Sequence, residues 1–498
     1  ENALCSAAYA VENIHFPEGD EALSLARRRL AFEELFLFAL GLAGLRSRRS
    51  AVTVPPMAAV DMAPFYAALP FSLTGAQRRS IDEALGDMRS GLPMNRLCQG
   101  DVGSGKTMVA AACVYFAARN GRQAALMAPT EILARQHYET LSPLLEKLGL
   151  RCALLTGSTG VKAKRETNAA LAAGDIDLAI GTHALLTGTV TFRDLGLVVT
   201  DEQHRFGVAQ RAALAEKGLH PHTLVMSATP IPRTLALILY GDLDVSLIDE
   251  LPPGRQPIET FAVPGSYRPR IYAFLRKHIA QGRQAYIVCP MVESGEEGGE
   301  DAKAVKDYAS QLQKEVFPDL RVAFVHGKMK PKEKEAVMAA FAAGETDLLV
   351  STTVIEVGVD VPNAAVMVVE NAERFGLSQL HQLRGRVGRG KHQSYCILIS
   401  DNQNEETRQR LKILTKTNDG FRLAEEDLRL RGPGDFFGVR QHGLPGLRVA
   451  DLGCDAQLLQ SAQRAAEALL REDPELARSP ALRDRVAELF ARNAETMN

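Results

Sequence analysis

GDVGSGKT, residues 100–107, is the stretch that decides the fold. It follows a short apolar strand pattern, NRLCQ at 95–99, and precedes a helical run, MVAAACVYFAAR at 108–119. A G-x-x-x-x-G-K-T loop in this context lets backbone N–H groups close on phosphate oxygens, while Lys106 faces the β/γ-phosphates and the Thr107 hydroxyl faces Mg²⁺. The alternative, an incidental glycine turn before a helix, is disfavoured by the strand and helix that flank the loop. The sequence therefore predicts an ATP site built on an α/β sheet.

Short apolar segments alternate with helical stretches around this loop, and they form two series. The first series lies at 124–129, 177–182, 195–202 and 222–229, and the second at 285–290, 321–327, 346–355, 364–370 and 394–400. Near-continuous apolar strands separated by helices are typical of parallel sheets covered on both faces. The proline-rich segment 250–259 (ELPPGRQPIE) lies between the two series and predicts an interdomain linker.

Helical patterning without strands occupies 20–46 and 450–495, and the acidic segment 293–301 (ESGEEGGED) is predicted to be a solvated loop. The predicted fold class is therefore α/β, with two tandem parallel-sheet lobes, a helical N-terminal segment and C-terminal helices, which the family resemblance given below implies to be a helical hairpin or hook. We place the boundaries at 1–52, 53–252, 253–404 and 405–498.

Composition argues against a disulfide-rich, a zinc-binding and a membrane-spanning protein. The 498 residues predict about three domains. A net charge of -2 leaves nucleic-acid binding open, since a balanced total can hide a basic groove. Seven scattered cysteines without a C-x-x-C pair indicate neither a disulfide framework nor a zinc site, and they favour a reducing cytoplasm. The apolar run 35–45 is shorter than the ~20 residues that span a bilayer, so we expect a buried core helix and no membrane partner.

Two further segments supply groups that ATP hydrolysis needs. In LGLVVTDEQH (195–204) an apolar strand delivers Asp201 toward Mg²⁺ and Glu202 beside it as general base for the attacking water. The alternative is an ordinary turn at a strand end. In QLHQLRGRVGRG (379–390) Arg384, Arg386 and Arg389 offer planar charges to the γ-phosphate, and the alternative is a basic surface turn.

The complete motif set resembles that of superfamily 2 helicases with two RecA-like lobes. From residue 71 to 390 the motifs follow in order: FSLTGAQ (71–77), GDVGSGKT, APTEILARQH (128–137), TGS (156–158), GTHAL (181–185), DEQH (201–204), SATPIPR (227–233), HGKM (326–329), STTVIEVGVDVPNA (351–364) and the arginine segment. DEQH differs from the DEAD sequence of many RNA helicases at a variable position. DGFRLAEEDLRLRGPGDFFGVRQHG (419–443) is similar to the translocation motif of RecG helicases and the transcription-repair coupling factor. Segments 14–36 and 71–107 resemble the RecG family specifically.

The motifs and this resemblance together assign candidate residues. The catalytic set is Lys106, Glu202, Arg386 and Arg389. The nucleotide set is Phe71, Gln77, Gly100, Asp101, Val102, Gly103, Ser104, Gly105, Lys106, Thr107, Gly358 and Asp360, with Gln77 reading the adenine base. The metal set is Thr107 and Asp201. The DNA and coupling set is Thr130, Arg135, Ser227, Thr229, Thr352, Thr353, Gln382, Arg410, Arg431 and Gln441.

The resemblance implies an ATP-dependent double-stranded DNA translocase that remodels stalled replication forks and Holliday junctions, with ATP and Mg²⁺ as cofactors. Branched and duplex DNA are the implied partners, a single-stranded-DNA-binding protein is a further candidate, and a monomer in the bacterial cytoplasm, associated with the nucleoid, is expected. An RNA helicase and a catalytically silent DNA-binding scaffold are the competing hypotheses. The chain begins at Glu1 without Met, and we expect it to lack most of the family's wedge domain and to regress forks poorly.

RGPGDFFG (431–438) has the look of a second phosphate loop. Its spacing is G-x-G-x-x-x-G, Pro433 removes an N–H donor, and a helical pattern precedes it. We therefore interpret it as a rigid turn after a helical hairpin, with Arg431 and Gln441 near the arginine segment and Arg410 as a weaker candidate partner.

Overall fold

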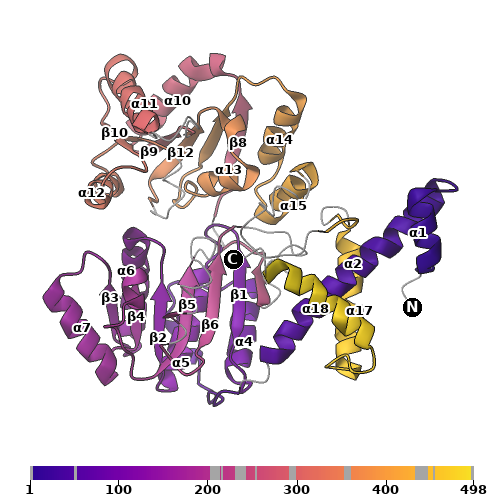
Figure 1. Cartoon of the computed structure of the whole chain (residues 1–498). Helices are drawn as coiled ribbons and strands as arrows, with labels where there is room; N and C mark the ends of the chain where they lie inside the picture. The colour runs from indigo at the N-terminus through magenta and orange to yellow at the C-terminus, as the bar shows by residue number, and fades with distance from the viewer. Residues whose placement is uncertain are drawn as a thin grey trace.

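Two parallel β-sheets form the centres of two lobes, one drawn below the other in Figure 1. The structure is a computed structural model, and it describes residues 4–49, 53–201, 213–214, 217–229, 243–252, 255–290, 299–352, 361–431, 447–451 and 455–494. Every strand pairing among these residues is parallel. Parallel strands need crossover connections, and the helices between them supply these.

The first lobe has the strand order β3-β4-β2-β5-β6-β1-β7. Its strands are β1 (Asn95–Gly100), β2 (Gln123–Met127), β3 (Cys152–Leu155), β4 (Leu178–Gly181), β5 (Leu195–Asp201), β6 (His222–Ser227) and β7 (Asp244–Ile248). Its helices are α3 (Ala63–Ala68), α4 (Gly75–Met88), α5 (Lys106–Arg119), α6 (Glu131–Glu146), α7 (Val161–Ala173) and the 3-10 turn η1 (His183–Leu186).

The second lobe has the strand order β10-β11-β9-β12-β13-β8. Its strands are β8 (Glu259–Val263), β9 (Gln284–Val288), β10 (Val322–Val325), β11 (Leu348–Ser351), β12 (Ala364–Val369) and β13 (Tyr395–Ile399). Its helical elements are η3 (Gly265–Tyr267), α10 (Arg268–Ala280), α11 (Gly299–Gln311), η4 (Leu312–Val316), α12 (Pro331–Ala342), η6 (Ala372–Arg374), α13 (Leu377–Arg384), α14 (Glu405–Lys416) and α15 (Gly420–Arg431).

A third, helical unit lies beside the first lobe (Figure 1) and joins the two ends of the described chain. It consists of α1 (Ala7–His15), α2 (Asp20–Arg49), α17 (Ala456–Glu472) and α18 (Pro480–Ala494). Phe32 and Leu35 of α2 share an apolar cluster with Leu459 of α17, Leu97 of β1 and Leu428 of α15. The Glu34 carboxylate accepts hydrogen bonds from the backbone N–H groups of residues 448–450. The unit is therefore packed onto the sheet that carries the GDVGSGKT loop and onto α15.

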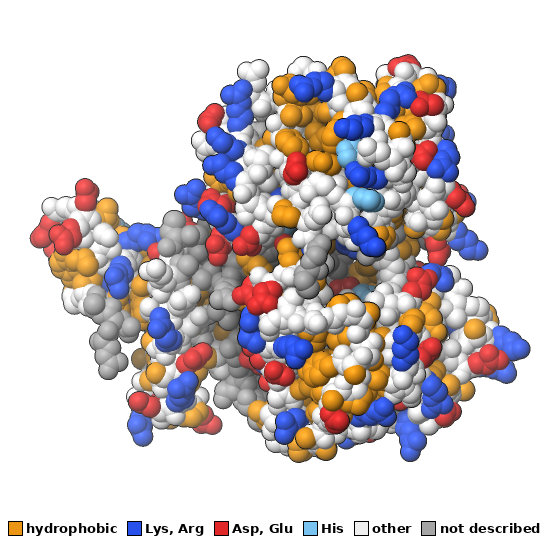
Figure 2. All heavy atoms as spheres, turned by 180° about the vertical axis from the view of Figure 1, so that it is seen from behind, with side chains coloured by type: hydrophobic (Ala, Val, Ile, Leu, Met, Phe, Trp, Pro, Cys, Tyr) orange, Lys and Arg blue, Asp and Glu red, His pale blue; other side chains and the backbone are white. Residues whose placement is uncertain are grey.

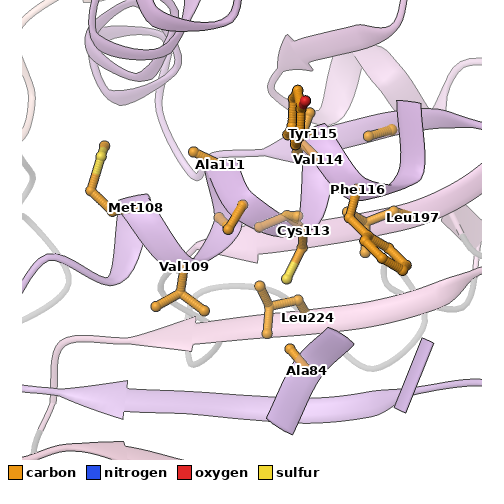
Figure 3. Close-up of a cluster of buried hydrophobic side chains, with 14 of the residues drawn as sticks. Ala84, Met108, Val109, Ala111, Cys113, Val114, Tyr115, Phe116, Leu197 and Leu224 are labelled. Carbon is orange, nitrogen blue, oxygen red and sulfur yellow. The ribbon is translucent and has the colours of Figure 1, made fainter. Parts of the chain in front are cut away.

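Helix α5 is buried almost all round, because apolar residues of α4 and of the sheet surround it. Figure 3 shows its side chains, from Met108 to Phe116, among Leu197 of β5, Leu224 of β6 and Ala84 of α4. A helix that is apolar on every face is stable only inside a core. The N-terminus of α5 is consequently held in a fixed place at the end of β1.

The predicted strands are confirmed to within two residues at each end, except that the run 346–355 forms β11 only over Leu348–Ser351 and its residues 353–355 lie outside the described part of the chain. The helical character of the two flanks is also confirmed. The sequence patterns missed β3, β7 and β8, which lie at sheet edges. Polar residues occur within β7 (DVSLI) and β8 (ETFAV), and β3 (CALL) is only four residues long and partly exposed. Two boundaries were wrong. The linker 250–259 ends in β8 at Glu259, and the predicted loop 293–301 overlaps α11, which begins at Gly299. The division into four domains stays a proposal.

The run 35–45 belongs to α2, and Leu35, Leu37, Phe38, Ala39 and Leu40 are buried, as predicted for a core helix. Among the described residues, no helix combines the length and apolarity needed to cross a bilayer. Figure 2 shows basic and acidic side chains interspersed over both lobes on the face in view, in line with the net charge of -2.

Candidate functional site

The GDVGSGKT loop runs from the end of β1 to the first residue of α5. Gly103 (φ 75°) and Gly105 (φ 85°) adopt left-handed backbone conformations that favour glycine. Lys106 is 8% exposed, and its Nζ donates to the carbonyl oxygens of Gly100 (2.7 Å) and Asp101 (2.8 Å). The lysine charge is thus held inside the loop, at the N-terminus of a rigid helix.

The residues of this loop fit a nucleotide phosphate. The Ser104 hydroxyl is fully buried and has no hydrogen-bond partner within the described part of the chain. A Cβ at Gly100 would lie 2.5 Å from Ser104 Oγ, so any side chain there would fill the loop. Backbone N–H groups at a helix N-terminus, next to a buried ammonium, form an anion-binding site.

Gln77 supports the loop from α4. Its Nε2 donates to the Ser104 carbonyl (2.8 Å), and its Oε1 accepts from the Thr74 backbone N–H (2.9 Å), which completes a capping box with the Thr74 hydroxyl. Gln77 is 1% exposed, whereas Phe71 is 48% exposed. The structure thus shows Gln77 bound to the phosphate loop, and its predicted contact with adenine stays a prediction.

Asp201 ends β5, and His137 of α6 contacts its carboxylate. The distance between His137 Nε2 and Asp201 Oδ2 is 2.7 Å, and both side chains are largely buried. His137 lies in the segment APTEILARQH, but no role was predicted for it. A histidine that ends this motif, ahead of a strand ending in Asp, is the signal that could have identified the pair.

Among the described residues no group of three His, Cys, Asp or Glu side chains could hold a metal. Mg²⁺ is usually held by one or two protein oxygens together with waters and phosphates, so Thr107 and Asp201 are suitable ligands.

The arginine segment of the second lobe lies directly on the phosphate loop. His381 Nε2 is 2.5 Å from Asp101 Oδ1, and that oxygen also accepts from the Val102 backbone N–H (2.6 Å). A Cβ at Gly385 would lie 2.8 Å from Val102 Cβ, so glycine is needed for this approach. Burial alone would raise the pKa of Asp101, but the hydrogen bonds from His381 and from the Val102 N–H and the nearby charge of Lys106 hold this pKa below its ordinary value. The two lobes therefore share one site.

A second contact between the lobes runs through SATPIPR. Gln382 Nε2 donates to Thr229 Oγ1 (2.7 Å), and Gln99 Nε2, at the end of β1, donates to the Thr229 carbonyl (3.3 Å). The Thr229 backbone N–H donates to Ser227 Oγ (3.3 Å). Gln382 is thus brought to Ser227 and Thr229 beside the phosphate loop, although it lies 153 residues from Thr229 in the sequence.

The three arginines of this segment are not equivalent. Arg384 is 2% exposed, and its guanidinium donates to the carbonyl oxygens of Leu414 and Thr417 (2.9 Å each) and to His381 Nδ1 (2.7 Å). The prediction that Arg384 offers its charge to the γ-phosphate is therefore wrong, because its guanidinium donates to the end of α14 and to His381. Arg386 is buried at the start of the following turn, and Arg389 Nε donates to the Gly385 carbonyl (3.2 Å).

Arg255, from the linker between the sheets, also reaches the loop. Its Nη1 donates to the Val102 carbonyl, and a side chain at Gly103 would collide with its guanidinium. The segment 250–259 was predicted only as an interdomain linker, and no role was predicted for Arg255. No local pattern identifies it, since the contact exists only once the linker folds back.

The predicted DNA residues lie along the first turns of α6 and in the second lobe. The Thr130 hydroxyl caps α6 by accepting from the Leu133 N–H (3.3 Å). Arg135 forms an ion pair with Glu335 of α12 (3.3 Å), which joins the lobes at a second place. Thr352 is 2% exposed, and its hydroxyl has no hydrogen-bond partner among the described residues. Arg410 donates to the Glu373 carbonyl.

Several candidates lie outside the described residues: Glu202, Thr353, Gly358, Asp360, Gln441, the RGPGDFFG turn from 432 onward, and the side chain of Arg431. Helix α15 ends at Arg431, as the helical pattern before that turn predicts.

Comparison with known proteins places this site in a family. The profile described as DEAD/DEAH box helicase matches residues 74–238, and that described as helicase conserved C-terminal domain matches 270–391. The profile described as ATP-dependent DNA helicase RecG, domain 3, C-terminal matches 417–489. The ATP-dependent DNA helicase RecG of Bacillus subtilis is 50% identical over 467 residues, which cover 93% of this chain and 68% of that protein. The chain belongs to the RecG family. The family predicted from the motifs is confirmed.

Further relatives agree with this RecG assignment. The ATP-dependent DNA helicase RecG of Synechocystis sp. is 52% identical over 486 residues, which cover 97% of the chain. A solved structure of RecG bound to a three-way DNA junction superimposes with a TM-score of 0.75 at 46% identity and covers 92% of the chain. The RecG-family chain therefore has the two RecA-like lobes that the motifs predicted. It spans 58% of the Synechocystis relative and 60% of that solved chain, less than two thirds of either.

Proposed function

We propose that this chain is the motor of an ATP-dependent double-stranded DNA translocase that remodels branched DNA such as stalled forks and Holliday junctions. The observation that carries the proposal is the double contact between the lobes, in which His381 and Gln382 of the arginine segment bind Asp101 and Thr229 beside the phosphate loop. A site shared by two lobes changes when they separate, and this change converts hydrolysis into movement. The RecG relative solved with a three-way junction supports the choice of branched DNA.

Within this proposal the chain's own residues bind and orient ATP. Lys106 and the loop amides hold the phosphates, Glu202 accepts a proton from the attacking water, and Arg386 and Arg389 offset the charge that develops on the γ-phosphate. Water attacks the γ-phosphorus, the bond to the β-phosphate oxygen breaks, and ADP and phosphate leave. Thr107 and Asp201 would hold Mg²⁺, which would supply charge neutralisation when bound.

The remaining nucleotide residues have supporting roles in this proposal. Phe71 stacks on the base, Gln77 and the glycines shape the loop, and Gly358 and Asp360 approach the nucleotide from the second lobe. His137 and Arg255 join the set on the basis of their contacts with Asp201 and Val102.

On the DNA side we propose phosphate contacts without sequence reading from Thr130, Arg135, Thr352 and Thr353. Arg135 would exchange Glu335 for a phosphate, and Thr352 would need to become accessible when the lobes move. Ser227, Thr229 and Gln382 couple the two sites, and Arg410, Arg431 and Gln441 belong to the translocation motif. A monomer in the bacterial cytoplasm, associated with the nucleoid, and contact with a single-stranded-DNA-binding protein complete the proposal.

The test is the ATPase rate of this chain with single-stranded, duplex and forked DNA and with RNA. Stimulation by forked or duplex DNA supports a DNA translocase, whereas stimulation by RNA alone supports an RNA helicase instead. Lys106→Ala should lower kcat at least about 100-fold, because a preorganised charge at the phosphates is lost.

Lys217→Ala is the matched control, since Lys217 Nζ also donates to two backbone carbonyls, those of Thr187 and Val190 (2.8 Å each), away from the loop. An equal loss of activity in both variants, or no loss in Lys106→Ala, would contradict the proposed site.

A further inference from the structure

One histidine of the first lobe contacts the carboxylate that is proposed to hold Mg²⁺. His137 Nε2 lies 2.7 Å from Asp201 Oδ2, and the two residues are 64 positions apart in the sequence. They come from different elements, α6 and the end of β5. A charged carboxylate has only acceptors, so the His137 Nε2–H group is the donor of this hydrogen bond. One carboxylate oxygen of Asp201 is thus bound by a side chain of α6.

The strand order places Asp201 close to the phosphate loop. Strand β5 pairs with β6, and β6 pairs with β1, which leads into the loop. Neighbouring strands lie about 4.8 Å apart, so the backbone of Asp201 is about 10 Å from β1. The other neighbour of β5 is β2, and α6 follows β2 along the chain. Helix α6 therefore starts at the same sheet edge as the loop, where His137 meets Asp201.

Helix α6 holds His137 in a fixed place. Ala134 and Leu141, about one helical turn before and after it, are fully buried in the same apolar cluster. The side chain of His137 lies on this buried face and is 10% exposed. The start of the helix is fixed as well, because Glu131 Oε1 accepts from the Ser158 backbone N–H (3.1 Å). His137 thus offers its N–H group from a rigid element.

The bond matters because of what Mg²⁺ requires. This ion demands near-ideal octahedral geometry, so a carboxylate that serves it must be held in one orientation. Groups that hydrogen-bond to a metal ligand orient that ligand, and their loss typically lowers metal affinity 10- to 100-fold. The Asp201 side chain is 14% exposed, and the bond from His137 restricts rotation of its carboxylate.

We propose that His137 is a positioning residue that fixes the Asp201 carboxylate for Mg²⁺ and thereby sets how tightly the chain holds nucleotide together with the ion. The proposal rests on the proposed function, since it concerns the same site. His137 acts through Asp201 and contacts neither the nucleotide nor the reacting water. Its loss should therefore weaken the contribution of the ion to binding, while the phosphate loop itself stays intact.

The test compares nucleotide affinity with and without the ion. Binding of the fluorescent, non-hydrolysable ATP analogue mant-AMP-PNP to the full chain is measured once in Mg²⁺ and once in EDTA. The ratio of the two dissociation constants, the metal ratio, gives the contribution of Mg²⁺ to binding. The dissociation constant in EDTA reports on the phosphate loop alone. Neither value depends on the rate of hydrolysis.

Two variants of His137 differ in reach by one methylene group. The amide of His137→Asn is too short to reach Asp201, whereas His137→Gln places an amide N–H near the position of the histidine Nε2. In His137→Asn the metal ratio should fall at least about tenfold, with the affinity in EDTA within about twofold of the parent. His137→Gln should restore the ratio to within about threefold of the parent, because it restores the bond to the metal ligand.

Steady-state kinetics supply a second readout. The Mg²⁺ concentration that gives half of the maximal ATPase rate should rise at least about tenfold in His137→Asn, since the ion is held less tightly. At saturating Mg²⁺ the kcat of this variant should stay within about twofold of the parent, because a positioning residue for the ion affects its binding rather than the chemical step.

A double variant and a control separate this role from general damage. Asp201→Ala/His137→Asn should lower the metal ratio no further than Asp201→Ala alone, since His137 acts only through Asp201. His222→Asn is the matched control, because His222 is also buried (3% exposed) but lies at the opposite end of the sheet, at the start of β6. This control should keep the metal ratio of the parent.

The outcomes distinguish His137 from the site that it serves. An unchanged metal ratio in His137→Asn, an equal loss of affinity in EDTA, a His137→Gln variant as weak as His137→Asn, a further loss in the double variant, or an equal loss in His222→Asn would each overturn the role of His137 and leave the nucleotide site standing. A parent chain that binds the analogue equally well in Mg²⁺ and in EDTA would overturn the proposed Mg²⁺ ligands, and the role of His137 with them.

Discussion

Replacing Arg384 with Met would show how firmly the α14–α15 hairpin is held by the second lobe. Met fills much of the space of the arginine stem but has no donors. The carbonyl oxygens of Leu414 and Thr417 and the Nδ1 atom of His381 would each lose a partner within a buried region.

The magnitude follows from the two carbonyls that belong to the hairpin. A buried acceptor without a partner costs about 1–3 kcal/mol, so two cost at least about 2 kcal/mol. The loss lowers the free energy that is needed to open α14 and α15 locally, because the two bonds exist only while this hairpin is packed on α13. An opening free energy lowered by about 2 kcal/mol accelerates hydrogen exchange roughly 30-fold.

Native-state hydrogen exchange of residues 405–431 is the assay, compared between the parent and Arg384→Met. Arg283→Met is the control, because Arg283 makes a similar bond to His278 Nδ1 but lies away from the hairpin. Acceleration of less than about threefold at the hairpin in Arg384→Met, or equal acceleration there in Arg283→Met, would refute the assigned role of Arg384.

Two further predictions concern stability. Burial, and next the charge of Arg122, lower the pKa of His222 to about 4, and the neutral ring accepts from the Met94 N–H (3.0 Å). Because the folded pKa lies below the unfolded value of about 6.5, this contribution is fully present above pH 6.5 and is lost as the pH falls toward 4, by up to about 3 kcal/mol. His222→Asn, which keeps an acceptor, should flatten the decrease of Tm between pH 7 and 4.5, and parallel Tm profiles would contradict this. Asp455 accepts two hydrogen bonds from Arg27 (3.0 and 2.8 Å) and one from the Asp451 N–H (2.8 Å). Asp455→Ala should destabilise α17 on α2 by about 1–2 kcal/mol, since Arg27 is partly exposed, and should speed exchange of α17 amides at least about fivefold. Asp455→Asn, which keeps an oxygen acceptor, should fall between Asp455→Ala and the parent.

Much of the fold could be predicted because its signals are local. The GDVGSGKT loop specifies a strand, an anion-binding turn and a helix within about 25 residues, and the apolar runs specify buried parallel strands. The edge strands β7 (DVSLI) and β8 (ETFAV) could not be predicted in this way, because polar residues stand within them. The edge strand β3 (CALL) is apolar but only four residues long and partly exposed, and it was missed as well.

For the candidate site, the structure shows where the described residues lie, while their roles stay predictions. Lys106, Asp101 and Gln382 were identified from motif spacing, and the structure places them at one junction of the two lobes. Arg384 was grouped with Arg386 and Arg389 because all three share a glycine-rich segment, yet its side chain points to α14. The residue type gives the charge of a side chain, but the spacing of residues in the sequence does not give the direction in which the side chain leaves the backbone.

By itself, the sequence determined two parallel-sheet lobes, a phosphate loop and the RecG family, since strand periodicity, glycine positions and motif order are properties of short stretches. Only the tertiary structure decided that His137 contacts Asp201, that Arg255 returns from the linker to Val102, and that His381 meets Asp101 across 280 residues. These pairings depend on how the lobes pack, which no local pattern encodes. The contacts of Arg384 with His381 and with the end of α14 likewise depend on how α13 packs against α14.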